Sequence, residues 1–363
     1  MTDAPVTSTS SALRKAWTTL KNENPQLRIR DCATRLGVSE AELLATTVGD
    51  YTVRLEGDWT EVMKLLPTLG RVMSLTRNES CVLEHKGAFE EVDIIKAGPH
   101  TMATVIGPIE TRVFFQGWKF GFAVREETQR GLMQSLQFFD KAGNAITKVY
   151  LQPATEQNAG SNQEAFDAIV KQFTAVEQSA DVVTEEIKTS PTLPIESVDK
   201  EALLTDWAEL KDTHDFFMLL RKHKVNRLDA AVLAEGKFTY PVKKESHRQL
   251  LEQASQTNLP IMIFAGNTGN IQIHQGEVKT IKVMESPEAV WLNVLDPDFN
   301  MHLREDHVAS AWVVKKPTVD GVVTGIEVFD SNKEMIVQFF GLRKPGREEL
   351  TAWRELVEAL PKA

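Results

Sequence analysis

Short apolar runs that alternate with polar residues follow one another through two long stretches of the chain. Turns that contain Gly, Pro or Asn separate these runs. In the first stretch the runs are 81–84, 92–95, 102–106, 112–115 and 135–139. Alternation of this kind, with turns at short intervals, is typical of an antiparallel meander. The pattern therefore predicts large antiparallel sheets.

Helical spacing of apolar residues flanks the strand regions. We expect helices over 11–21 and 27–45, with Ser39 as an N-cap and carboxylates in the turn that follows it. Further helices are predicted over 162–173, 200–222, 226–234 and 347–360.

The two strand regions resemble each other in sequence. Val82–Gly87 is similar to Ile271–Gly276 at an offset of about 189 residues, and Leu136–Asp140 is similar to Ile326–Asp330 near the same offset. The order and spacing of these matches predict an α+β fold made by tandem duplication, in which each copy is a large antiparallel sheet flanked by helices.

The duplication divides the chain into an N-terminal repeat over 1–173 and a C-terminal repeat over 201–363. Residues 174–200 lose periodicity and contain two prolines, so we expect them to form the linker. Residues 1–11 are polar and rich in Ser and Thr, and we expect a short disordered leader there.

Composition narrows the class of protein. The 363 residues are 42% hydrophobic and 25% charged, an ordinary globular composition, and no run approaches the ~20 apolar residues that span a bilayer. The leader lacks a signal-peptide core, so we expect a cytoplasmic protein that is not membrane-embedded. A net charge of -10 argues against general nucleic-acid binding. Cys32 and Cys81 are expected to be packing residues.

One histidine interrupts an apolar helical stripe. Positions Leu203, Trp207, Leu210, His214 and Phe217 follow the spacing of a single helix face, and the stripe is apolar except at His214. Two interpretations are open: a core histidine bonded to a carbonyl, or the ligand of a flat apolar cofactor.

The ligand interpretation requires apolar walls and cations for the carboxylates at the cofactor's edge. Phe216, Phe217 and Phe264 are candidate walls. Arg227 and Arg343 are candidate cations, because a guanidinium group binds a carboxylate with two parallel hydrogen bonds.

Several segments together resemble a bacterial protein family. The chain is similar to the HemS/ChuS-type haemin-transport and haemin-degrading proteins from about residue 12 to 358. The segments that carry the resemblance are Asn24-Pro25, Arg30-Asp31, Asp212–Phe217, Arg227–Ala230, Leu303–Trp312 and Gln338–Arg343.

The resemblance implies a haem b cleft at the C-terminal half, with haem as ligand or substrate. It implies His214 as the axial ligand of the haem iron and Arg112 as an arginine from the first half on the distal side. The other cofactor-binding residues it implies are Arg227, Phe264, Gln338 and Arg343. Val337 takes the position of a tyrosine in relatives, and His85 leaves a second haem site open.

Three functions remain open at this stage. The first is a haem carrier of bacterial iron acquisition, which would take haem from a haem ABC transporter's cytosolic face and pass it to an acceptor or oxygenase. The second is an enzyme that opens the porphyrin ring with oxygen, in the manner of a non-classical haem oxygenase. The third is an interaction module without a cofactor, in which His214 belongs to the core. Either a monomer or a dimer fits the sequence.

Overall fold

The computed structural model describes residues 9–97, 100–129, 131–188, 190–343 and 346–363. Most of the expected leader lies outside these ranges, and residues 9–11 belong to helix α1 (Thr9–Glu23). The chain divides into two compact units. Unit 1 consists of Met1–Arg77, His85–Lys188 and Gly266–Ile271, and unit 2 of Asn78–Glu84, Thr189–Ala265 and Gln272–Ala363. None of the described helices is long and apolar enough to cross a membrane.

Unit 1 contains an antiparallel array of five strands in the order β1-β7-β8-β9-β2. A second antiparallel group, β4-β5-β6, is a meander. The strands are β1 (Thr52–Leu55), β2 (Val72–Arg77), β4 (Glu91–Ala97), β5 (His100–Ile106), β6 (Glu110–Phe114), β7 (Phe120–Thr128), β8 (Gly131–Phe139) and β9 (Ala145–Leu151). The prediction of large antiparallel sheets is confirmed.

The helices of unit 1 cover its strands with apolar faces. Helices α4 (Trp59–Leu65) and α5 (Gln163–Phe173), with the 3-10 turn η1 (Leu66–Leu69), contribute to one buried cluster. The predicted helix over 27–45 is instead two helices, α2 (Ile29–Leu36) and α3 (Glu40–Ala45), because Gly37 adopts a left-handed φ of 70°. The predicted N-cap is confirmed: Ser39 and Glu42 form a capping box.

The second half of the chain repeats this order of elements, which confirms the duplication. Its antiparallel array is β10-β16-β17-β18-β11, and its meander is β13-β14-β15. Both arrays carry a bulge at the matching place, between Phe138 and Phe139 and between Val328 and Phe329. The strands are β10 (Thr239–Val242), β11 (Ile261–Gly266), β13 (Ile281–Ser286), β14 (Ala289–Leu295), β15 (Phe299–Arg304), β16 (Ser310–Thr318), β17 (Gly321–Phe329) and β18 (Met335–Gly341).

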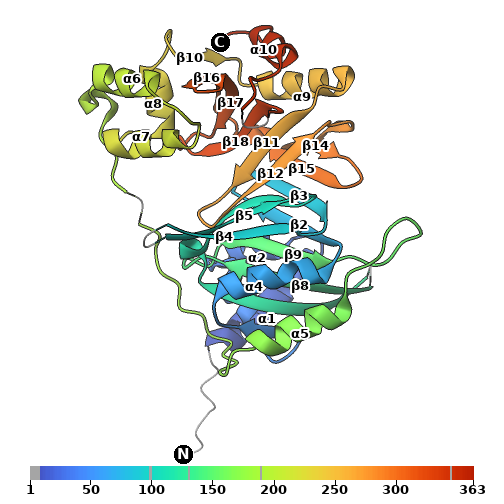
Figure 1. Cartoon of the computed structure of the whole chain (residues 1–363). Helices are drawn as coiled ribbons and strands as arrows, with labels where there is room; N and C mark the ends of the chain where they lie inside the picture. The colour runs from blue at the N-terminus through green and yellow to red at the C-terminus, as the bar shows by residue number, and fades with distance from the viewer. Residues whose placement is uncertain (1–8, 98–99, 130, 189, 344–345) are drawn as a thin grey trace, which may run out of the picture. The chain divides into compact units, whose positions relative to one another are not determined.

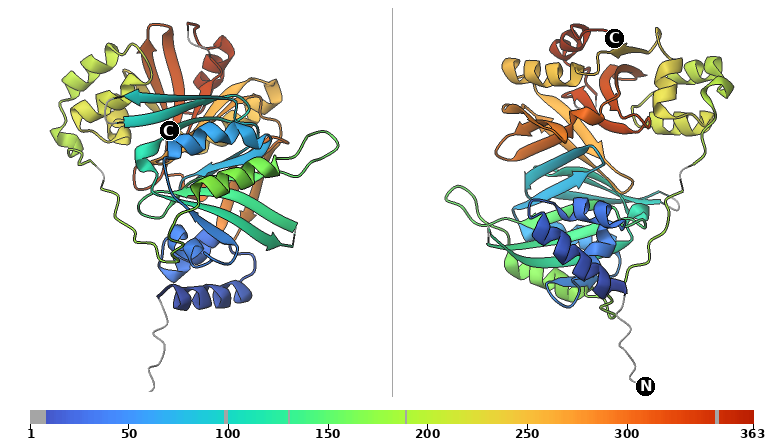
Figure 2. Two further views of the ribbon diagram at one scale, coloured as in Figure 1. Left: turned by 60° about the horizontal axis from the view of Figure 1, so that its bottom comes forward. Right: turned by 180° about the vertical axis from the view of Figure 1, so that it is seen from behind.

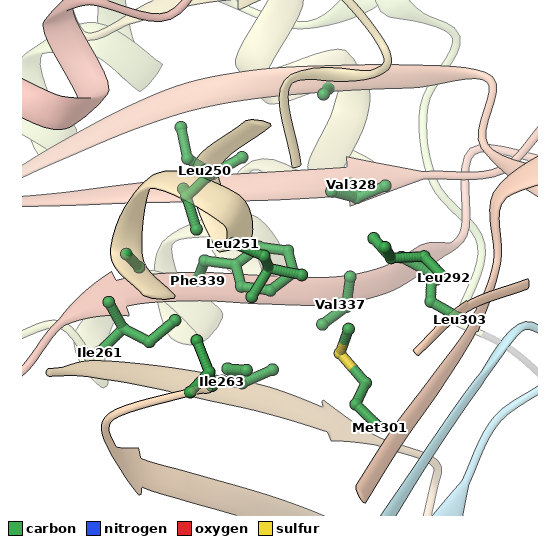
Figure 3. Packing of buried hydrophobic residues seen from close by; sticks show 14 of the residues in the cluster. Leu250, Leu251, Ile261, Ile263, Leu292, Met301, Leu303, Val328, Val337 and Phe339 are labelled. Carbon is green, nitrogen blue, oxygen red and sulfur yellow. The ribbon is translucent and has the colours of Figure 1, made fainter. Parts of the chain in front are cut away.

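The array of unit 2 buries both of its faces against helices. On one face, α9 (Ser246–Thr257) and α10 (Thr351–Glu358) cover a core that includes Leu250, Val337 and Phe339 (Figure 3). On the other face lie α6 (Lys200–Ala208), α7 (Asp215–His223) and α8 (Arg227–Leu233), the yellow-green helices of Figures 1 and 2. Strand alternation therefore decides which side chains meet which group of helices.

Each unit includes a short hairpin segment from the other half of the chain. These segments join β2 to β3 (Cys81–Gly87) and β11 to β12 (Asn270–Gly276). In unit 1, the amide nitrogen of Asn267 donates to the carbonyl oxygens of Arg77 (2.9 Å) and Ile146 (2.8 Å). Its amide oxygen accepts from the backbone N–H groups of Gly269 and Asn270. One side chain thus both shapes the turn and fixes it to unit 1.

We predict that Asn267→Ala destabilises the protein by about 2–6 kcal/mol, because four hydrogen bonds of about 0.5–1.5 kcal/mol each are lost. Asn267→Asp should cost at least as much, since it replaces the two donors with a carboxylate beside two carbonyl oxygens. The measurement is denaturant unfolding followed by circular dichroism. Asn332→Ala, in an exposed turn, is the control and should stay within about 0.5 kcal/mol of wild type. Equal midpoints for Asn267→Ala and the control would contradict the assigned role.

Candidate functional site

His214 lies immediately before helix α7 and not inside a longer helix. The single helix predicted over 200–222 is wrong, because α6 ends at Ala208 and α7 begins at Asp215. The side chain of Asp212 accepts a hydrogen bond from the backbone N–H of His214 (2.8 Å), and that of Asp215 accepts from the backbone N–H of Asp212 (3.2 Å). Aspartates satisfy backbone donors at such ends better than inside helices.

The exposure of His214 decides between the two interpretations of the stripe. Its side chain is 88% exposed, so the interpretation as a core histidine is wrong. Leu203 and Trp207 are fully buried, whereas Phe217 is 61% exposed. The predicted stripe is therefore divided in two. Its first residues are buried on α6, and His214 lies in a later segment with its imidazole exposed to solvent.

The ring of His214 is held by a carboxylate. Its Nδ1 lies 2.5 Å from Oδ1 of Asp212, the same oxygen that accepts from the His214 backbone. The backbone N–H of His214 and then its ring keep the pKa of Asp212 below its usual value. With Nδ1–H donating to a carboxylate, Nε2 of the neutral imidazole carries the free lone pair.

A row of side chains crosses the unit 2 array on the face that α6–α8 cover. Trp312 on β16 pairs with Glu327 on β17, Glu327 with Gln338 on β18, and Gln338 with Phe264 on β11. Directly paired residues share a face of the sheet. The structure therefore brings together Phe264 and Gln338, two of the predicted site residues. It also places Glu327 beside Gln338, on the neighbouring strand.

Glu327 is the centre of a buried polar network. Its carboxylate is 1% exposed and accepts two hydrogen bonds from Arg227, one to each oxygen, at 2.7 and 2.8 Å. Gln338 donates to it at 2.8 Å and Lys316 at 3.2 Å. The network holds two cations and one carboxylate, so it has a net positive charge.

The charged groups of this network shift one another's pKa values. Burial alone would raise the pKa of Glu327, but Arg227 and Lys316 bring it down to about 2. Burial lowers the pKa of Lys316 to about 8; Glu327 opposes that shift and Arg227 adds to it. Lys316 carries the weaker ion pair because the bidentate arginine already neutralises the carboxylate.

Aromatic rings connect this network to the segment of His214. Phe216, two residues after the histidine, is buried between Arg227 (5.0 Å from guanidinium carbon to ring centroid) and Lys316 (4.4 Å). Phe216 is therefore a core residue and not an exposed wall. Phe264 packs edge-to-face on Phe340 at 5.3 Å, and both rings are only partly buried. These two rings supply the apolar wall.

Arg343 lies near the carboxylate that holds His214. It is the cation after β18 whose charge helps to lower the pKa of Asp212, and its guanidinium is 3.9 Å from Asp320. The backbone N–H of Val319 donates to the carbonyl oxygen of Lys211 (3.0 Å), which joins the β16–β17 turn to the segment before His214. Arg343, Asp212 and His214 thus share one side of unit 2.

Arg112 belongs to unit 1 and is engaged there. Its guanidinium is 2.9 Å from Glu110 and also donates to the carbonyl oxygens of Val105 and Thr111. Its side chain is 26% exposed. A role toward a ligand requires these local bonds to be shared or broken.

Two other expectations concern buried positions. His85 is 7% exposed on β3, with Nδ1 at 3.3 Å from the carbonyl oxygen of Pro108, so no exposed imidazole is available there for a second haem. Val337 points into the core beneath α9 and α10, on the opposite face of β18 from Gln338. Val337 therefore does not share a face with Gln338, because adjacent residues of a strand point to opposite faces.

Asp212, Lys316 and Glu327 belong to this arrangement but were not among the residues predicted from the sequence. One of them leaves a recognisable signal, because Glu327 stands inside the apolar run Ile326–Phe329. A charge inside such a run indicates a buried ion pair or a site. The contact between Asp212 and the ring of His214 has no comparable signal.

Comparisons with known proteins find both a family and individual relatives that match the chain. A family described as "Haemin-degrading HemS.ChuX domain" matches twice, at residues 37–173 and 224–360. The chain is 34% identical to the hemin transport protein HemS of Yersinia enterocolitica over 357 residues, which is 97% of this chain and 98% of HemS.

Two solved structures cover almost the whole chain. The holo form of PhuS, a heme-binding protein from Pseudomonas aeruginosa, is 43% identical with a TM-score of 0.91 and covers 98% of this chain and 99% of its own. The heme degrading enzyme ChuS of Escherichia coli O157:H7 is 32% identical with a TM-score of 0.86 and covers 97% and 99%. One of these two is thus described as a binding protein and the other as an enzyme.

The buried network predicts a pH dependence of stability. Because the pKa of Lys316 is about 8 in the folded chain and 10.5 ordinarily, the unfolded chain binds the extra proton between these values. Folding stability should then rise with pH over this window, by up to about 3 kcal/mol relative to Lys316→Met. The measurement is urea unfolding of both proteins from pH 7 to 10.

Lys148 provides a matched control. It is also buried, but its partner Glu40 outweighs the effect of burial and raises its pKa. The stability difference between wild type and Lys148→Met should therefore stay flat over the same pH range. A flat difference for Lys316→Met as well would show that Lys316 is not held with a lowered pKa.

Proposed function

The chain belongs to the family of haemin-degrading HemS and ChuX domains, and from this membership we propose that it binds haem b and carries it as cargo, with Nε2 of His214 on the iron. The observation that carries the proposal is the state of His214. The imidazole is exposed and its Nδ1 contacts Asp212, so Nε2 is the ring nitrogen left to bind a metal. A neutral imidazole nitrogen is a common axial ligand of haem iron.

The surroundings of His214 suit a flat dicarboxylate. Phe264 and Phe340 offer a partly exposed apolar wall, and Gln338 stands beside them on the same face. Arg227 uses Nε and Nη2 for Glu327, which leaves Nη1 for a propionate. Arg343 is a further cation on the side of His214. Haem requires this combination of an iron ligand, an apolar surface and cations at its edge.

We propose that Arg112 serves the distal side of the same haem, as the family resemblance implies. Its partly exposed side chain supports a role toward a ligand, and its bond to Glu110 supports a fixed orientation. We further propose that the protein works in the cytoplasm, where it takes haem from a transporter and passes it to an acceptor or oxygenase. The naming of the Yersinia relative as a transport protein supports that role.

Ring opening is the second candidate function, because the family's description and one similar solved structure refer to degradation. When bound, haem would supply the iron at which oxygen reacts with electrons from an external reductant. The residues of this chain would hold it: His214 on the iron, and the cations at its edge. The same site therefore serves either function.

Titration with haemin tests the proposal. Wild type should give a Soret band of histidine-ligated haem, and His214→Ala should shift or lose it and bind at least about tenfold more weakly. His100→Ala, which removes an exposed histidine of unit 1, should leave the band unchanged. If His214→Ala matches wild type in band position and affinity, the assignment of the ligand is wrong.

A second measurement separates cargo from substrate. We expect haem bound to the wild type to keep its Soret band under air with a reductant and catalase present. A ring-opened tetrapyrrole that forms under these conditions in wild type and not in His214→Ala would establish the enzyme instead. Loss of the band only without catalase would indicate peroxide side-chemistry.

A further inference from the structure

Asp212 makes more contacts with His214 than the turn requires. The chain reversal between α6 and α7 already has a backbone hydrogen bond, from the N–H of Asp215 to the carbonyl oxygen of Asp212 (3.2 Å). The side chain of Asp215 caps the N–H of Asp212, and the side chain of Asp212 caps the N–H of His214. The contact of Asp212 with the imidazole is additional, because none of these bonds depends on the ring.

The ring contact places a charge on the far side of the imidazole from Nε2. Oδ1 of Asp212 is 2.5 Å from Nδ1, so the neutral ring donates Nδ1–H to a carboxylate. Arg343 is the cation whose field reaches Asp212. Asp215, the other acid of this turn, bonds the backbone of Asp212 and not the ring. Asp212 is therefore the acid of this turn that is hydrogen-bonded to the imidazole.

A carboxylate in this position changes the iron ligand in two ways. It fixes the tautomer and the orientation of the ring, and it makes Nε2 a stronger donor to the metal. A stronger, more anionic ligand favours ferric over ferrous iron, because the ferric ion carries one more positive charge. When haem covers the ring and excludes water, the hydrogen bond acts in a less polar medium and its effect grows.

We propose that Asp212 is a positioning residue for the iron ligand: it presents Nε2 of His214 to haem and lowers the reduction potential of the bound iron. This inference rests on the proposed function, since it needs haem at His214. With a lower potential, the protein would prefer ferric haem as its cargo. Less of the iron would then be in the ferrous state, which reacts with oxygen. The reaction concerned is the addition of one electron to ferric iron.

Asp212→Asn separates this role from a structural one. The asparagine oxygen can still accept from the backbone N–H of His214, so the turn is retained while the negative charge is removed. Asp215→Asn is the matched control, because it neutralises the other acid of the same turn without touching the ring. Circular dichroism and the unfolding midpoint check that both variants fold.

The first readout is the haem-free protein. In wild type, nitrogen NMR of the neutral His214 ring should show the proton on Nδ1, the reverse of the tautomer favoured by free histidine. Asp212→Ala should restore the ordinary tautomer with the proton on Nε2, and Asp215→Ala should not. An Nε2–H tautomer in the wild type would overturn the proposal without reference to haem.

The second readout is the midpoint potential of the haem-loaded full chain, measured by spectroelectrochemistry with the electron supplied by the electrode. Loss of a partner behind a metal ligand changes metal affinity by about 10- to 100-fold. If that loss falls on the ferric form, the potential of Asp212→Asn rises by about 59 mV for each factor of ten. Asp215→Asn should remain close to wild type.

The outcomes distinguish this inference from the proposed function. A wild-type Soret band that depends on His214, together with equal potentials in wild type and Asp212→Asn, overturns the inference and leaves haem binding intact. A wild type without a His214-dependent band overturns both. A potential that rises equally in Asp212→Asn and Asp215→Asn indicates a general charge effect and also overturns the role of the ring contact.

Discussion

The buried carboxylate of Glu327 is the interaction on which the candidate site depends. It stands 1% exposed in the middle of an antiparallel array and holds Arg227, Lys316 and Gln338 at hydrogen-bond distance. Without this carboxylate, the two buried cations would repel each other, and nothing would compensate for their lost hydration. Because Arg227 opens α8 and Lys316 stands on β16, the carboxylate also ties helix to strand. The cost of burying three charges is offset only while all the partners remain, so the network fixes one arrangement of this surface.

Strand alternation gives the unit 2 array two different faces. Val328 and Val337 point to one side, where α9 and α10 seal an apolar core, while Glu327 and Gln338 point to the other. A one-residue change of register would exchange these sets and place the charges in the core. Burial of the valines on the apolar face stabilises this register, and the register in turn brings the charged side chains together on the polar face. One face of the array therefore forms a packed apolar core, and the other carries the polar and charged side chains.

The sequence predicted the architecture well and the local geometry less well. Alternation and turns were enough for the antiparallel sheets, and the similarity of Val82–Gly87 to Ile271–Gly276 was enough for the duplication. The spacing of Leu203, Trp207 and His214 predicted one continuous helix, and this prediction is wrong. Periodicity cannot show that the segment with Asp212 and Asp215 separates two helices. It also could not show that Arg227 and Lys316 meet on Glu327, since the three residues come from separate elements.

The distribution of charge explains how an acidic protein can offer a site to another acid. The chain carries a net charge of -10, which repels polyanions at long range. In the network around Glu327, however, Arg227 and Lys316 stand against one carboxylate, so the cations are in excess by one. That excess lies in a half-buried place where Coulomb interactions are strong and screening is weak. A small ligand that brings its own carboxylates together with an apolar body gains from both, whereas a large polyanion meets the acidic surface first. From this local cationic excess within a globally negative molecule, we expect a compact apolar acid to be favoured over a polyanion.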